Sequence, residues 1–110
     1  MRFFSKIFNK RTFDKKLEGV WVSDLGDEET KKKIGKVIMT FTNDGKLIYD
    51  AIEGNLLQRI NMIYWTSGDI IYSDQLSSPK QESTKYHFDS NGNLNLEIEG
   101  DKTKFKRQAK

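Results

Sequence analysis

From Leu17 onward the chain consists almost entirely of β-strand signals separated by short turn signals. Eight strands are predicted, at residues 17–24, 34–42, 46–52, 56–66, 69–75, 83–89, 93–99 and 102–108. Most of the segments between them are short enough for hairpins, and several offer a Gly or Asn for a positive φ angle. Because short loops join neighbouring strands antiparallel, the pattern predicts an up-and-down meander.

The alternation of apolar and polar side chains is clearest near the end of the chain. Leu94, Leu96 and Ile98 share one face of their strand, opposite asparagine and glutamate side chains. A sheet with one apolar face and no covering helix can bury that face only by closing on itself, and closure also removes exposed edges. The sequence therefore predicts an all-β fold, an eight-stranded antiparallel up-and-down β-barrel over residues 17–108. A five- or six-stranded sandwich is the alternative if some strands are misassigned.

The longest connection, residues 25–35, follows the first strand. Its acidic residues precede its lysines, the order that a helix dipole favours. This connection is predicted to form either a single helical turn or a solvated loop.

Composition and charge bound the class of protein. A chain of 110 residues forms one domain, and 35 % apolar against 32 % charged residues suits a thin core under a charged surface. The absence of cysteine excludes disulfides and thiolate chemistry. Residues 1–16 hold six Lys or Arg and one Asp, a net charge of +5 against +3 for the whole chain, which leaves −2 for residues 17–110. Nucleic-acid binding needs clustered cations on the folded surface, so no nucleic-acid partner is predicted.

The N-terminal segment, residues 1–16, combines basic and aromatic side chains. Phe3 with Ile7 and Phe4 with Phe8 are i,i+4 pairs, so a short helix would gather them on one side. Three interpretations stay open: a plug that caps the barrel, a contact with a membrane or a protein partner through residues 1–13, or a disordered tail. Lys6 interrupts the apolar run that a secretion signal needs. We expect a cytoplasmic protein, with a peripheral position at the inner membrane face as an option.

Gly19 and Trp21 stand two residues apart and therefore share a face of the first strand. On the inward face, Gly19 leaves space where the barrel closes and Trp21 fills the floor, where its indole N–H needs a partner. The alternation of the last strand places Arg107 inward beside Phe105, so that its cation can lie on the indole.

These three residues resemble the signature of the lipocalin and fatty-acid-binding (calycin) superfamily. That family carries Gly-x-Trp in its first strand, and an Arg or Lys of its last strand packs over the Trp; Gly19, Trp21 and Arg107 match this structural signature. The chain is shorter than typical lipocalins and has no recognisable C-terminal helix, so it looks more like the compact bacterial lipocalin-like domains. The resemblance implies a protein that is not an enzyme, needs no cofactor and holds a small apolar ligand in the barrel.

The predicted ligand-binding residues are the aromatic side chains expected inside the barrel. They are Phe41, Tyr49, Tyr64 (or its neighbour Trp65), Tyr72, Tyr86 and Phe88. Such side chains form an apolar cup whose tyrosine hydroxyls orient a ligand. The alternative is a filled core, because an eight-stranded barrel has room either for packed side chains or for one small ligand.

No group of side chains predicts a metal site, and catalysis by carboxylates alone stays open as a third alternative. His87 is the single histidine and is expected on the outer face, and nothing indicates that any two of Asp24, Asp50 and Asp74 converge. Residues 89–93 lack the spacing of a calcium loop and predict a hairpin turn. The alternative to ligand binding is a protein-interaction module, such as a cytoplasmic inhibitor or immunity protein that blocks another protein.

Overall fold

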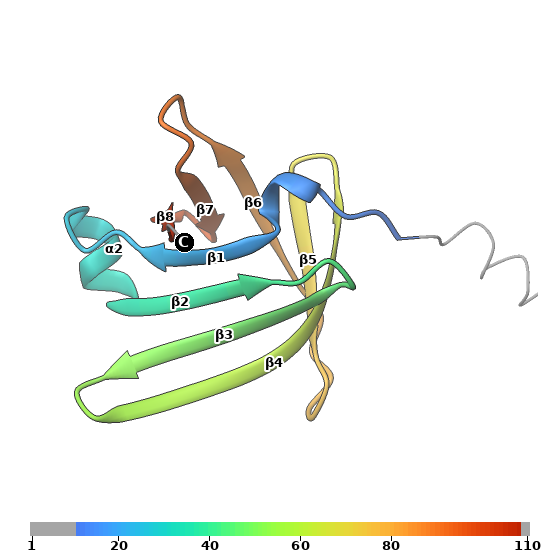
Figure 1. Ribbon diagram of the computed structural model, residues 1–110, viewed down its shortest axis with the longest axis horizontal. Helices are drawn as coiled ribbons and strands as arrows, with labels where there is room; N and C mark the ends of the chain where they lie inside the picture. Colours follow the sequence, from blue (N-terminus) through green and yellow to red (C-terminus); the bar gives the residue numbers. More distant parts are fainter. Residues whose placement is uncertain (1–10, 109–110) are drawn as a thin grey trace, which may run out of the picture.

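The computed structural model describes residues 11–108, which form a closed barrel of eight antiparallel strands (Figure 1). The strands are β1 (Gly19–Ser23), β2 (Lys36–Phe41), β3 (Lys46–Glu53), β4 (Leu56–Ser67), β5 (Ile70–Gln75), β6 (Glu82–Phe88), β7 (Leu94–Ile98) and β8 (Asp101–Arg107). A 3₁₀ turn, η1 (Lys15–Leu17), precedes β1, and a short helix, α2 (Glu28–Lys33), joins β1 to β2.

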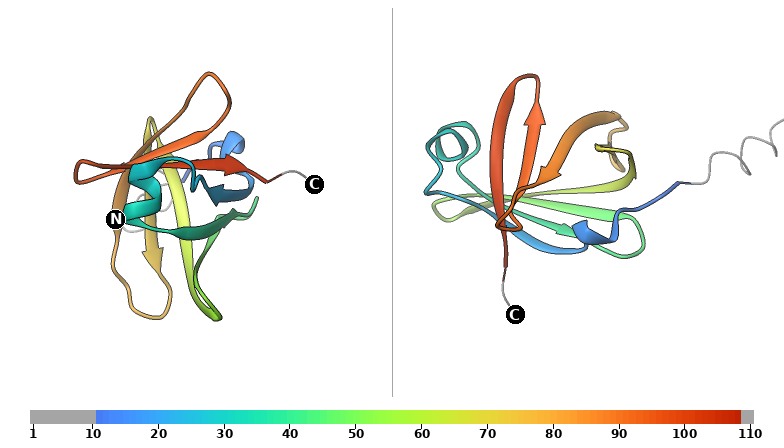
Figure 2. Two further views of the ribbon diagram at one scale, coloured as in Figure 1. Left: turned by 90° about the vertical axis from the view of Figure 1, so that its left-hand side faces the viewer. Right: turned by 90° about the horizontal axis from the view of Figure 1, so that it is seen from above.

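Each strand pairs with the next one along the chain, and β8 pairs with β1 to close the barrel through the register Trp21 to Arg107. Seen from the α2 side, the strands surround a common interior (Figure 2). The predicted eight-stranded up-and-down barrel is confirmed, and every strand begins and ends within two residues of its predicted bounds. The hairpin loops explain this agreement, because each is too short to reach any strand but its neighbour.

The barrel has two different ends. One, which we call the Leu17 end, carries η1 and the β2–β3, β4–β5 and β6–β7 turns. The other, the α2 end, carries α2 and the β3–β4, β5–β6 and β7–β8 turns. Neither helix within residues 11–108 has the length and hydrophobicity needed to cross a membrane.

α2 confirms the helical alternative for the β1–β2 connection. Asp27 caps it by accepting a hydrogen bond from the Thr30 backbone N–H at 3.1 Å. The helix is fastened to β8, because the Glu29 carboxylate accepts from the Lys102 N–H at 2.9 Å and the Thr30 hydroxyl accepts from the Lys104 N–H at 2.7 Å. α2 therefore lies across the barrel end beside β8.

Most of the fully buried side chains lie at the Leu17 end and in the middle of the barrel, whereas Val37, near the start of β2, and Thr30, in α2, lie at the α2 end. The full set is Trp21, Tyr64, Phe105, Leu17, Leu94, Val37 and Thr30. Strand alternation explains most of this set, because residues two apart point to the same face of the sheet. In β2, for example, Val37, Met39 and Phe41 are buried, and the residues between them are not.

Residues 11–17, which we call the N-terminal strap, run along the barrel at the Leu17 end. Thr12 forms a bridge with Thr66 of β4, and the ring of Phe13 packs edge-on against Tyr64 at 5.5 Å. Leu17 is completely buried in the core cluster. The predicted boundary between an N-terminal segment and a barrel at residue 17 stays a prediction, although Arg11 already contacts Trp65 of the barrel.

The β7–β8 hairpin contains a strained residue. Its turn consists of Glu99 and Gly100, both with positive φ angles of 51° and 89°. Two positive φ angles define a type I′ turn, which favours Asn-Gly. We expect Glu99→Asn to raise the free energy of unfolding by about 0.5–1 kcal/mol in urea denaturation, because Asn adopts this conformation at lower cost. Glu99→Ala is the matched control and should bring no gain; equal gains from both would contradict the assignment to backbone strain.

Candidate functional site

The predicted structural signature comes together at the floor of the barrel. The indole N–H of Trp21 donates to the Leu17 carbonyl at 2.8 Å, so the buried polar atom has its partner. The guanidinium of Arg107 lies over the indole, with its Cζ 4.3 Å from the ring centroid. Its nitrogens also donate to the carbonyls of Lys16 at 2.6 Å and Glu18 at 2.7 Å. Arg107 thereby joins η1 to β8 over the tryptophan.

Gly19 provides the room for this guanidinium. Its φ angle is +122°, a conformation that side chains rarely adopt, and a Cβ at this position would lie 2.7 Å from Nη1 of Arg107. The glycine beside the tryptophan is therefore required by the close approach of Arg107. The predicted contact between the last strand and the indole is confirmed.

All of the predicted lining residues except Tyr72 face the interior, and three of them are buried at the Leu17 end: Phe41, Tyr64 and Tyr86. The hydroxyl of Tyr86 donates to Asp14 at 2.6 Å, and that of Tyr64 to the Thr42 carbonyl at 3.3 Å. Burial raises the pKa of Tyr64 to about 12, and burial together with the Asp14 carboxylate raises the pKa of Tyr86. These hydroxyls are occupied within the protein, so this end of the barrel is a packed core.

The prediction for Tyr72 is wrong, because its ring lies on the outer face. In β5 the inward positions are Ile71 and Ser73, and Tyr72 pairs across the outer face with Trp65. The two rings stack at 5.7 Å with an interplanar angle of 15°, and Arg11 of the strap covers Trp65 at 3.7 Å. The outward tryptophan gives Tyr72 a stacking partner that the interior does not offer at this position.

The two remaining predicted residues, Tyr49 and Phe88, are half-buried and face inward. Phe88 packs against Trp21 at 5.8 Å and belongs to the floor. Tyr49 pairs with Met39 and Ile60 in mid-barrel, and burial raises its pKa. Of the predicted residues, Tyr49 alone lies toward the α2 end.

At the α2 end, side chains that continue the inward alternation are exposed. Leu56 pairs with Glu53 across the β3–β4 hairpin and is 72 % exposed, and Ile98 of β7 is 49 % exposed. On the same inward face, Leu94 at the other end of β7 is 0 % exposed. Core positions are thus packed at the Leu17 end and open to solvent at the α2 end. We call this region the open lumen, lined by Ala51, Leu56, Ile60 and Ile98, with half-buried Tyr49 at its inner limit.

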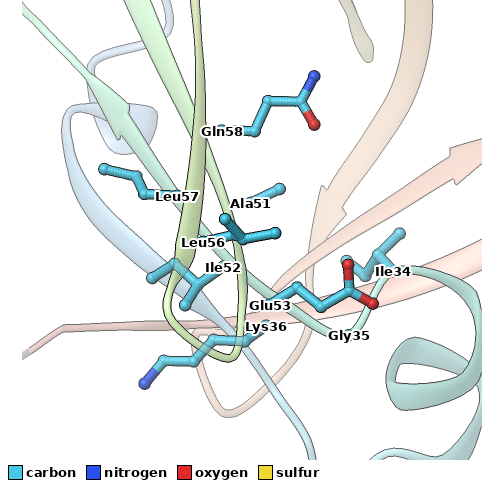
Figure 3. A pocket seen from close by; sticks show the side chains of 9 residues that line it. All are labelled: Ile34, Gly35, Lys36, Ala51, Ile52, Glu53, Leu56, Leu57 and Gln58. Atoms are coloured by element: carbon cyan, nitrogen blue, oxygen red, sulfur yellow. The ribbon is translucent and has the colours of Figure 1, made fainter.

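A hollow of about 480 Å³ lies at the β3–β4 side of this end. In Figure 3, Ala51, Leu56 and Gln58 project to the same side of the hairpin, toward Ile34. A second hollow, of about 640 Å³, adjoins Ile98 between β5, β6 and β7. Volumes of this size are typical of sites for small molecules.

The sequence prediction named only aromatic side chains as ligand contacts, so it did not include the aliphatic residues that line the open lumen. Alternation was the available signal: Leu56, Ile60 and Met62 follow the same period of two that leads to buried Tyr64. The sequence could not show that this face stays uncovered at one end, since that depends on how far the long β3–β4 hairpin extends beyond its neighbours.

A second apolar surface lies outside the barrel. Outward positions of β1–β4 carry Val20, Val22, Ile38, Ile48, Ile52, Leu57 and Ile63, with Lys36, Thr40, Lys46, Asp50, Arg59 and Asn61 among them. The outward positions of β6–β8 carry Lys85, His87, Asn95, Glu97, Lys102, Lys104 and Lys106 instead. We call the first set the outer apolar face. It places hydrophobic side chains where a barrel in water normally has polar ones.

An ion pair sits within the outer apolar face. Arg59 donates from Nε to Oδ1 of Asp50 at 2.7 Å and from Nη2 to Oδ2 at 3.0 Å, and the Asp50 side chain is almost covered. This bidentate hydrogen bond lowers the pKa of the Asp50 carboxyl.

The lowered pKa makes the stability of the barrel depend on pH. A group whose pKa falls on folding contributes stability above its unfolded value, near 3.9, and that contribution is lost as the pH falls through the folded value. The unfolding free energies of wild type and Asp50→Asn should therefore differ most above roughly pH 5 and converge below roughly pH 3. Urea denaturation across this range measures the difference; a constant difference would contradict the role of the ionised carboxylate.

The remaining polar candidates are not brought together. His87 is exposed and pairs with Asn95 on the outer face. Asp24 and Asp74 each accept from a nearby backbone N–H, of Gly26 and Lys80 respectively. Within residues 11–108, no group of three His, Asp or Glu side chains is placed to hold a metal ion.

The predicted membrane or partner contact falls on Phe3, Phe4, Ile7 and Phe8, which lie outside the described residues. The helix expected there stays a prediction. No family model matches the chain, and no curated protein matches it either.

Proposed function

We propose that this protein is a lipocalin-like binding protein, not an enzyme, that holds a small apolar molecule in the open lumen. The observation that carries the proposal is the exposure of Leu56 and Ile98 at inward positions. Exposed aliphatic side chains in a concave, strand-built wall gain free energy when an apolar ligand covers them. The packed floor at Trp21 would limit how deep such a ligand enters.

The lipocalin-like assignment rests on the arrangement around Trp21. A closed eight-stranded meander, a Gly-x-Trp in the first strand and an arginine of the last strand on the indole occur together here. The compactness of the barrel fits a short ligand that occupies one end, because the aromatic side chains already fill the other.

The test is titration with N-phenyl-1-naphthylamine, an uncharged apolar fluorophore, followed by its emission. Saturable binding is expected. Leu56→Ser should weaken the affinity about three- to tenfold, because the ligand covers part of the leucine side chain and the variant loses a fraction of the free energy of burying a whole one. Leu76→Ser is the matched control, since this leucine is also 58 % exposed but lies in the β5–β6 connection and lines neither hollow. Absence of saturable binding, or equal losses from both variants, would contradict the proposal.

A second candidate function, a protein-interaction module such as an inhibitor or immunity protein, is favoured by the outer apolar face. Apolar side chains gathered on the outside of a small domain, with polar ones among them, are typical of partner binding sites. A partner that co-purifies in stoichiometric amount should be lost with Ile48→Glu, in the middle of this face, and retained with Leu56→Ser. The reverse pattern would argue against the outer apolar face as the site.

A further inference from the structure

At the β3–β4 hollow, the one charged side chain of the lining that lies on the inward face is a carboxylate. Glu53 ends β3 on the inward face, opposite Leu56. Figure 3 shows its carboxylate turned toward Ile34, on the side where Ala51 and Leu56 also project, and shows Lys36 on the opposite side of the hairpin. The Glu53 carboxylate thus borders the hollow. Lys36, the lysine in the lining of that hollow, points away from the carboxylate.

The strands provide no cation to balance this carboxylate from within. All lysines of the eight strands occupy outward positions in the register: Lys36, Lys46, Lys85, Lys102, Lys104 and Lys106. Among residues 11–108, Glu53 belongs to none of the ion pairs, whereas the other inward acids of the α2 end do: Asp101 pairs with Lys33, and Glu82 with Lys80.

The one inward cation of the strands, Arg107, lies at the Leu17 end, away from a ligand in the open lumen. Arg107 lies over Trp21 at the floor, and its nitrogens donate to the carbonyls of Lys16 and Glu18. An anionic head group in the β3–β4 hollow would therefore meet Glu53 without an inward cation in that lining, whereas Lys80 and Lys85 line the second hollow. A cationic head group would meet an opposite charge at the edge of an apolar wall.

We infer that the ligand is a cationic amphiphile, an apolar chain or ring that carries an ammonium group. The apolar part covers Leu56 and Ile60, and the ammonium group lies beside the Glu53 carboxylate. This inference rests on the proposed function, because it assigns a charge to the ligand of the same open lumen.

The experiment displaces bound N-phenyl-1-naphthylamine with three ten-carbon competitors below their micelle concentrations: decyltrimethylammonium, decanol and decanoate at pH 8. The expected order of affinity is cation, neutral, anion, with the cation about two- to fivefold tighter than the alcohol, the range of an exposed ion contact. The preference for the cation should shrink as salt is added.

Glu53→Gln should remove the preference for the cation and leave decanol affinity unchanged. Glu28→Gln is the matched control, because this exposed glutamate lies in the first turn of α2 and lines neither hollow. If the fluorophore binds but decanoate competes as well as the cation, or Glu53→Gln leaves the order unchanged, the charge inference is overturned and the proposed function stands. If the fluorophore does not bind, both fall.

Discussion

Replacing Trp21 with alanine is expected to lower the free energy of unfolding by about 3–5 kcal/mol, the usual cost of removing a large buried aromatic side chain. The indole is completely buried, donates to the Leu17 carbonyl and packs against Phe88 and the Arg107 guanidinium. A domain of this size has only about 5–15 kcal/mol of stability, so the variant should be close to unfolding at 37 °C. Urea denaturation followed by circular dichroism measures the loss.

The chain contains its own control for this substitution. Trp65 lies half-buried on the outer face of β4, stacked between Tyr72 and Arg11. Trp65→Ala leaves no cavity in the core. It should lower the free energy of unfolding by about 1–2 kcal/mol, because it removes one aromatic pair and one cation–π contact. Equal losses for the two tryptophans would contradict a floor built on Trp21.

Replacing Leu17 with alanine is the second change with a large expected effect. Leu17 lies in η1, outside any strand, yet it is completely buried against the core at the Leu17 end. The substitution should lower the free energy of unfolding by about 2–5 kcal/mol, because the cavity it leaves can relax only in part. The midpoint of urea denaturation gives the value.

The matched control is Leu57→Ala on the β3–β4 hairpin. This leucine is 58 % exposed, so its loss should change stability by no more than about 0.5 kcal/mol. If Leu17→Ala behaves like Leu57→Ala, the N-terminal strap does not close the barrel. Deletion of residues 1–10 separates the contribution of the strap from that of the segment before it, because the deletion keeps the contacts of Arg11 and Thr12 with β4.

Strands and topology could be predicted because each local signal was unambiguous. Leu94, Leu96 and Ile98 alternate with polar residues, and most turns between strands are too short for any connection but a hairpin. The contact of Arg107 with Trp21 followed from the same alternation, once the barrel was assumed to close between the first strand and the last.

Alternation failed where three consecutive residues of a strand are apolar or aromatic. Ile70, Ile71 and Tyr72 begin β5 without a polar residue to mark the outer face. Which of them points inward depends on the register with β4, and that register places Tyr72 beside the outward Trp65. The inward position there goes to Ser73, a residue that hydrophobicity alone does not select.

The open lumen could not be predicted because it depends on strand lengths in three dimensions. β3 and β4 extend beyond the strands across the barrel, so their last inward side chains have no partner opposite. The inward position of Glu53 follows from alternation, but its exposure beside the hollow does not.

The most direct measurement is the paramagnetic relaxation of methyl groups by a neutral, water-soluble gadolinium chelate, read from methyl NMR spectra of the free protein. The methyl groups of Leu56 and Ile98 should relax strongly, and those of Leu17 and Leu94, at the other end of the same interior, should stay protected. Strong relaxation at Leu94, or protection at Leu56 and Ile98 equal to that at Leu94, would contradict a barrel that is packed at one end and open at the other.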